Sequence, residues 1–168
     1  METFEAIRTL LAMRAFRDAP IPDDVTREIV EAARLTASSI NGQPWRFVVV
    51  RDRQTLDQLA ALSPTGRYIA QAPLAIVVGT LPSPYGVSDA SRAIQSMMLA
   101  AWSHGVASNW VGFHVADAVK SLLGIPEDVD VLAIVPFGYP ARPAGAGAKK
   151  RKPLGEIAFS ERYGQPFS

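Results

Sequence analysis

Three short runs of apolar, mostly β-branched residues constrain the fold of this chain more than any other feature. They are residues 46–51 (RFVVVR), 74–80 (LAIVVGT) and 129–139 (VDVLAIVPFGY). Apolar runs this short, bounded by turn residues, are typical of strands that lie inside a domain. Segments with helical periodicity alternate with them, so we predict helices packed on a sheet of four or five strands.

The helical segments follow from apolar residues that recur every three or four positions. We also expect a further strand at 108–113 (SNWVGF), which contains Gly112. The expected helices are 4–11, 25–33, 53–62, 88–103 and 116–124. We find no internal repeat and no linker that would divide the chain, so we expect a single domain over residues 1–168.

Composition excludes several classes of protein. Net charge is +1, which gives no overall field for nucleic acid or an anionic membrane. The chain has no cysteine, which excludes disulfides, thiol nucleophiles and cysteine-ligated metals. Its apolar runs are shorter than the roughly 20 residues of a membrane span, and charges interleave the first residues, unlike a signal peptide. We therefore expect a soluble, cytoplasmic protein without nucleic-acid or membrane partners.

Catalytic side chains of the familiar kinds are missing. The two histidines, His104 and His114, stand in no HExxH motif, and no serine stands in GxSxG. No phosphate-binding GxxxxGK[ST] occurs, and GAGAKK lacks the strand-to-helix setting of a dinucleotide loop. The sequence predicts no metal site and no protein nucleophile. If the chain is an enzyme, a bound cofactor has to carry the chemistry.

Cations form two candidate binding elements. Arg14 and Arg17 are three residues apart, which places both guanidinium groups on one side if the first helix continues that far. Their donors suit phosphate or carbonyl acceptors, although a solvated helix end would look the same. Residues 149–152 (KKRK) are typical of a solvated tail, and their place after an Ala/Gly segment also allows them to fold over a phosphate.

A polar stretch precedes the first expected strand. Residues 38–43 (SSINGQ) contain two hydroxyls and the amides of Asn41 and Gln43, a mixture of donors and acceptors. This mixture matches the edge of a ring with alternating carbonyl and N–H groups, but a plain turn is an equal alternative. Gly112, inside an expected strand, indicates that another molecule approaches the backbone there.

Taken together, these segments resemble the FMN-dependent nitroreductase-like family. The resemblance covers residues 4–164 and rests on blocks in the family's order. They are IPDDVTREIVEAARLTASSINGQPWRFVVVRD, IAQAPLAIVV, AIQSMMLAAWSHGVASNWVGF, LLGIPEDVDVLAIVPFGYPA and RKPLGEIAFSERYG. The family fold is α+β, a three-layer α/β/α sandwich around a mixed, largely antiparallel sheet.

The resemblance implies an FMN site at the interface of a homodimer, with a C-terminal arm of about residues 140–168 packed on the partner. Arg17 would approach the pyrimidine edge of the flavin, Lys149 and Arg151 its phosphate, and Gly112 its reactive nitrogen. The expected cofactor-binding residues are Arg14, Arg17, Ser38, Ser39, Asn41, Gln43, Gly112, Lys149 and Arg151. NAD(P)H would reduce the flavin, and a nitroaromatic, quinone or similar small-molecule acceptor would then reoxidise it.

Departures from the family pattern keep a second hypothesis open. Met13 stands where an arginine is expected to reach the phosphate, and Ala15 replaces a serine expected to contact the flavin. Ala37 also replaces a common proline. The alternative is a degenerate relative that binds or sequesters flavin without turnover, or a dimeric interaction protein that has lost it. A specialised enzyme that fragments flavin or removes halogen from an aromatic is a further alternative.

Overall fold

A computed structural model describes residues 1–112, 116–142 and 149–167. Its core is a sheet of four strands in the order β1-β2-β4-β3, in which every pair of neighbours is antiparallel. The strands are β1 (Trp45–Val50), β2 (Leu74–Thr80), β3 (Ala107–Ser108) and β4 (Asp130–Gly138). The three apolar runs therefore form β1, β2 and β4, as predicted.

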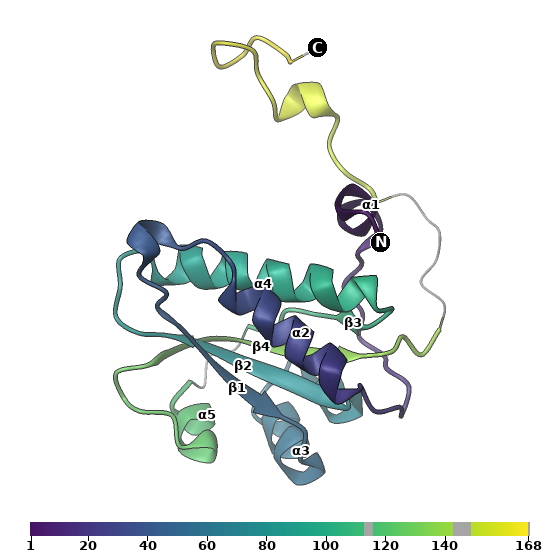
Figure 1. The fold of residues 1–168 in the computed structure, drawn as a ribbon, viewed down its shortest axis with the longest axis vertical. Helices are drawn as coiled ribbons and strands as arrows, with labels where there is room; N and C mark the ends of the chain where they lie inside the picture. Colours follow the sequence, from purple (N-terminus) through teal and green to yellow (C-terminus); the bar gives the residue numbers. More distant parts are fainter. Residues whose placement is uncertain (113–115, 143–148, 168) are drawn as a thin grey trace.

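Helices cover the sheet on both faces (Figure 1). Helices α2 (Asp23–Arg34) and α4 (Gly86–Ser103) lie on one face, and α3 (Arg53–Ala61) and α5 (Ala116–Leu123) lie on the other. Alternate residues of β2 and β4 enter the two cores: Val78 packs toward α4, whereas its neighbour Val77 belongs to the cluster with α3. All of β2 is buried, which explains its unbroken apolar sequence. This arrangement confirms the expected α+β, three-layer fold.

The N-terminal helix α1 (Thr3–Thr9) lies at the end of α4, where the indole Nε1 of Trp102 donates to the Thr9 hydroxyl over 2.9 Å. Short 3₁₀ turns occur at Ser39–Asn41, Arg67–Gln71 and Leu154–Glu156. The C-terminal segment 149–167 extends away from the layered body beyond α1 (Figure 1). Within the described residues, no helix is long and apolar enough to cross a membrane.

The predicted strand at 108–113 is wrong in its extent. β3 ends at Ser108, an isolated bridge from Val111 to Ile134 follows it, and Phe113 lies outside the described residues. The backbone bonds to β4 nevertheless continue, because the amide of Asn109 donates to the Pro136 carbonyl over 3.3 Å and Val111 exchanges two bonds with Ile134 over 2.9 and 3.0 Å. The Trp110 amide points elsewhere and donates to the Oδ1 of Asn109 over 2.8 Å. Gly112 therefore follows the sheet instead of lying inside a strand.

Candidate functional site

The polar loop, residues 38–43, connects α2 to β1 in an unusual backbone conformation. Ile40, Asn41 and Gln43 have φ angles of 50°, 55° and 46°, in the left-handed region that residues other than glycine rarely adopt. Asn41 tolerates this region, because its short amide can bond locally, but a β-branched isoleucine does not favour it. Such a conformation persists only where the surrounding contacts impose it.

Hydrogen bonds within the polar loop fix how its side chains point. The hydroxyl oxygen of Ser38 accepts the backbone amide of Gln43 over 3.0 Å, which closes the loop. The Gln43 Nε2 donates to the Asn41 Oδ1 over 3.1 Å. Both amide side chains are exposed, so their remaining donors and acceptors are available to a ligand.

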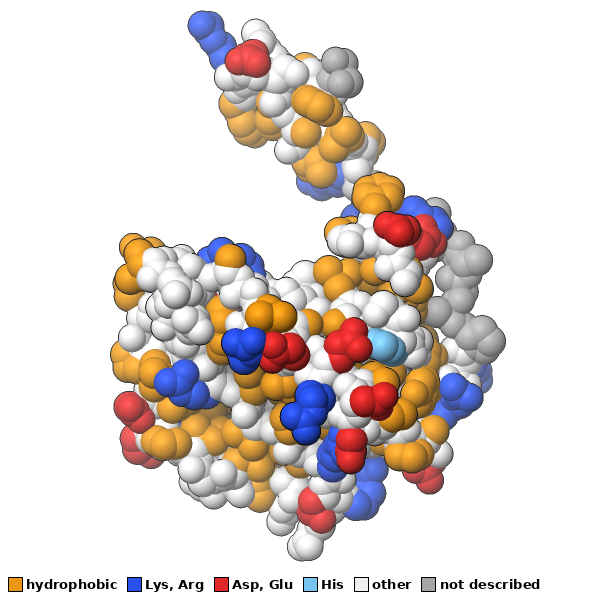
Figure 2. All heavy atoms as spheres, viewed as in Figure 1, with side chains coloured by type: hydrophobic (Ala, Val, Ile, Leu, Met, Phe, Trp, Pro, Cys, Tyr) orange, Lys and Arg blue, Asp and Glu red, His pale blue; other side chains and the backbone are white. Residues whose placement is uncertain are grey.

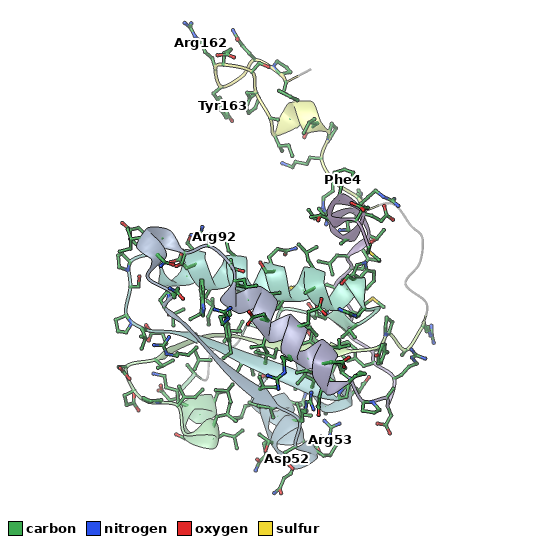
Figure 3. The ribbon with its side chains drawn as sticks, in the orientation of Figure 1. Phe4, Asp52, Arg53, Arg92, Arg162 and Tyr163 are labelled. Atoms are coloured by element: carbon green, nitrogen blue, oxygen red, sulfur yellow. The ribbon has the colours of Figure 1, made fainter. Side chains whose placement is uncertain are left out.

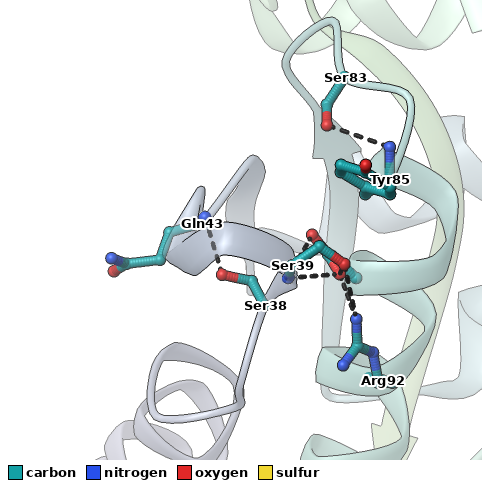
Figure 4. A network of polar contacts seen from close by, with 7 residues as sticks. Ser38, Ser39, Gln43, Ser83, Tyr85 and Arg92 are labelled. Carbon is teal, nitrogen blue, oxygen red and sulfur yellow. Dashed lines mark hydrogen bonds and ion pairs between the residues drawn. The ribbon is translucent and has the colours of Figure 1, made fainter.

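The hydroxyl of Ser39 is occupied within the protein. It donates to Oδ1 of Asp89 over 3.1 Å, and the Ser39 amide donates to both carboxylate oxygens of Asp89 over 3.1 and 3.2 Å (Figure 4). Arg92 pairs with the same carboxylate. The sequence analysis missed Asp89 and Arg92, although an acid three residues before an arginine on an otherwise apolar helix was a usable signal.

The cations of the N-terminal segment lie on extended backbone. The condition for Arg14 and Arg17 to share one side of a helix, that the first helix continues that far, is therefore not met. The helix ends at Thr9, and the amide of Arg17 donates to the Tyr139 carbonyl over 2.8 Å. A bridge between Phe16 and Pro140 continues this pairing. Tertiary pairing with the end of β4 overrides the helical tendency. The Arg17 guanidinium lies 5.4 Å from the centre of the Tyr139 ring, a cation–π geometry.

Arg14 lies beside Tyr68, another residue that the sequence analysis missed. Partial burial raises the pKa of the Tyr68 hydroxyl, and the Arg14 guanidinium that hydrogen-bonds it opposes this shift. Asn109 is a third member of the cluster, and its side chain also acts to lower the pKa of the Tyr68 hydroxyl. Its Nδ2 is buried and has no hydrogen-bond partner among the described residues. No sequence motif links these three residues, since they come from different segments.

Lys149 lies against α1, where its ammonium donates to the carbonyl of Ile7 over 2.5 Å. Two effects lower the pKa of Lys149: the larger is partial burial, and the smaller is the positive charge of Arg151. Across the described parts of the chain, neither of these cations forms an ion pair with a carboxylate, and the same holds for Arg14 and Arg17. We call these four cations the basic group. It is a set of positive charges that the described chain does not neutralise.

Gly112 is exposed, and the space beside it is open. Among the described residues, a Cβ atom added there would meet nothing nearer than the Trp110 Nε1 at 4.0 Å. His114 lies outside the described residues. The part of the chain that the structure describes also holds no cluster of three or more potential metal ligands. The available chemistry is therefore cations and amides.

The polar loop and the basic group lie at opposite ends of α4. The loop bonds to Asp89 near the start of this helix, whereas α1 meets Trp102 near its end. At 1.5 Å per residue, these two contacts are about 20 Å apart along the axis. Lys149 is tied to α1, and Arg17 is tied to the end of β4. One copy of the chain thus separates the two halves of the expected site.

Comparison with known families and relatives gives a consistent result. The model described as "Nitroreductase family" matches residues 11–66 and 65–139. A relative from Methanothermobacter thermautotrophicus, provisionally named an NADH dehydrogenase/NAD(P)H nitroreductase, is 33% identical over 155 residues. That alignment covers 86% of this chain and 81% of the relative.

Solved structures show the same fold. A protein from Bacteroides thetaiotaomicron with the same provisional name superposes with a TM-score of 0.87 at 28% identity, covering 97% of each chain. A protein from Clostridium difficile named an FMN-dependent nitroreductase has a TM-score of 0.88 at 22% identity. That match covers 95% of this chain and 99% of the other, so the architecture is shared almost from end to end.

Proposed function

The chain belongs to the nitroreductase family, and on this premise we propose that it binds FMN and uses NAD(P)H to reduce a nitroaromatic, a quinone or a similar acceptor. The basic group is the observation that carries the proposal. Its four cations are held near one end of α4 without a carboxylate partner among the described residues. Positive charges left unneutralised in this way favour an anionic ligand.

The residues present fit FMN by the chemistry of their donors. Lys149 and Arg151 offer charge-assisted hydrogen bonds to a phosphate dianion. The exposed amides of Asn41 and Gln43 supply both donors and acceptors, as the polar edge of a flavin and its ribityl chain require. Gly112 leaves open space beside its backbone, where a flat ring can approach.

We propose that the complete site forms between two copies of the chain. The polar loop of one copy would meet the basic group of its partner, because a single copy holds them at opposite ends of α4. In a two-fold symmetric dimer the same pairing forms twice, which gives two equivalent sites. Relatives carry the provisional name NADH dehydrogenase/NAD(P)H nitroreductase, which agrees with a site made of cations and amides.

The C-terminal arm supports this dimer. It exposes large apolar side chains (Figures 2 and 3). Tyr163 is 92% exposed and Ile157 is 62% exposed, and Phe4 on the neighbouring α1 is 76% exposed. Contiguous apolar surface of this kind marks a protein contact. We propose that the arm, about residues 140–168, packs on the partner chain as part of one domain over residues 1–168.

Bound FMN would supply the redox chemistry of this reaction, which is hydride acceptance from NAD(P)H and electron transfer to the acceptor. The chain contributes binding and electrostatics. Arg17 would supply a positive charge toward the negative charge of a reduced flavin, which would favour reduction. Lys149 and Arg151 would hold the phosphate, and Asn41 and Gln43 would orient the polar edge. The open space beside Gly112 leaves room for the substrates to exchange.

Two residues favour a second candidate function, flavin binding without reductase turnover. Met13 is packed into the small apolar cluster of Phe16 and Trp102, so it gives the phosphate no charge. The carbonyl of Ala15 accepts the amide of Ala141, and its side chain offers no hydroxyl. Both features remove polar contacts that the family pattern would supply.

The visible absorption spectrum of the purified protein, before and after addition of excess FMN and desalting, tests the proposal. We expect flavin bands that survive desalting and NAD(P)H oxidation that depends on an added quinone or nitro compound. Retained FMN without turnover would favour the second candidate. A protein that stays colourless after FMN addition would contradict both.

A further inference from the structure

Asp89 has a buried carboxylate. Within the described chain, its hydrogen bonds come from Ser39 of the polar loop and from Arg92. Asp89 is 1% exposed, in the first turn of α4. Three hydrogen bonds arrive from Ser39, two from the amide and one from the hydroxyl. Arg92, one turn later on the helix, supplies the positive charge and also reaches the Ser39 hydroxyl over 3.3 Å.

The conformation of the polar loop needs an external support of this kind. Three of its residues have positive φ without being glycine, and Ile40 gains nothing from burial, since it is 89% exposed. The loop's own bonds, from Gln43 to Ser38 and Asn41, close it but do not attach it to the body. Asp89 attaches it at Ser39. A second tie, from the Thr36 hydroxyl to the Ser96 hydroxyl over 2.7 Å, fixes the preceding segment to the same helix.

We propose that Asp89 is a positioning residue for cofactor binding: its carboxylate, charge-balanced by Arg92, holds the polar loop so that Asn41 and Gln43 face the cofactor. Asp89 itself does not touch the cofactor, because it is buried behind Ser39. This inference rests on the proposed function, since it assigns Asp89 a role toward the proposed FMN site. A role limited to the start of α4 predicts something different, namely that removing the acid weakens the helix and leaves the loop unchanged.

Amide hydrogen exchange on the protein without added flavin separates these roles. In Asp89→Ala and the milder Asp89→Asn, we expect the amide of Ser39 and the closing amide of Gln43 to lose protection, by about tenfold or more for the loss of a charged hydrogen-bond acceptor. The amides in the second half of α4 should keep their protection. The matched control is Asp57→Asn, which removes an acid that pairs with Arg53 at 3.5 Å on α3, away from the loop.

Titration of FMN against the same variants completes the experiment. We expect the FMN dissociation constant to rise about tenfold in Asp89→Ala, less in Asp89→Asn and not at all in Asp57→Asn. Unchanged loop protection in Asp89→Ala, or lost protection with unchanged FMN affinity, would overturn the inference. If the wild-type chain binds no FMN, the proposed function fails and the role of Asp89 toward the cofactor fails with it; the exchange data show whether Asp89 still holds the loop.

Discussion

Gly138 shows how one residue sets the path of the N-terminal segment. A Cβ atom at this position in β4 would lie 2.9 Å from three atoms of the buried Phe16. Gly138→Ala therefore has to displace the ring, and we expect it to lower the free energy of unfolding by about 1–3 kcal/mol. Urea denaturation measures the change. The control is Gly112→Ala, which has open space and should stay within about 0.5 kcal/mol; equal losses in the two variants would contradict the packing argument.

Arg17 allows the electrostatic part of the proposed site to be tested at a single side chain. Its guanidinium is exposed and contacts the Tyr139 ring, so its removal costs the fold little. We expect Arg17→Ala to weaken FMN binding by about tenfold to a hundredfold, the value of a charged hydrogen bond. Quenching of flavin fluorescence measures the affinity. Arg53→Ala on α3 is the matched control, and an equal effect there would indicate a non-specific loss of charge.

At the scale of elements, α3 depends on a side-chain cap that responds to pH. Oδ2 of Asp52 accepts the amide and the hydroxyl of Thr55 over 2.8 and 2.7 Å. Both hydrogen bonds lower the pKa of Asp52, and the bond from the Thr55 hydroxyl has the larger effect. A carboxyl with a lowered pKa stabilises the fold fully above its unfolded pKa of about 3.9, and this stabilisation is lost as the pH falls through the folded value.

Asp52→Ala should therefore be less stable than the wild type at neutral pH, and the difference should narrow in acid. Urea denaturation at a series of pH values down to the folded pKa measures it. Asp24→Ala, at the exposed start of α2, removes an acid that accepts only the amide of its neighbour Val25. It therefore controls for the loss of a surface acid whose side chain does not cap its helix. A stability difference that stays constant across the series would show that the cap of α3 does not act through its charge.

The elements that could be predicted from the sequence are those whose structure is set by their own local pattern, and not by contacts with distant residues. β2 and α4 follow from their own apolar patterns, which local periodicity records. The path of the segment around Arg14 does not, because backbone bonds to Ser108, Tyr139 and Ala141 decide it. The residues of the polar loop could be named from sequence, and the spacing of Asp89 and Arg92 indicated their ion pair. The bond from Ser39 to Asp89 could not be predicted, since it joins positions 50 residues apart.

At the scale of the whole molecule, the distance between the polar loop and the basic group is the main result. The resemblance to a family suggested a site between chains, and the described chain supplies a physical reason, because α4 holds the two halves apart. Under the proposed function, a second copy of the chain would bring them together without any change to the layers. The C-terminal arm also exposes apolar residues, and the proposed second copy would cover them.

Mixing two inactive variants tests this arrangement. Asn41→Ala/Gln43→Ala removes the amides of the polar loop, and Arg17→Ala/Arg151→Ala removes half of the basic group. If each site takes one half from each chain, a mixed dimer has one intact site and one site with both defects. Co-refolding equal amounts should recover about a quarter of wild-type NAD(P)H oxidation, since half of the dimers are mixed and each has one of its two sites intact. Recovery requires subunit exchange, which tagged chains verify by co-purification. Mixed dimers without activity would mean that each chain builds its site alone, and the interface proposal would fail.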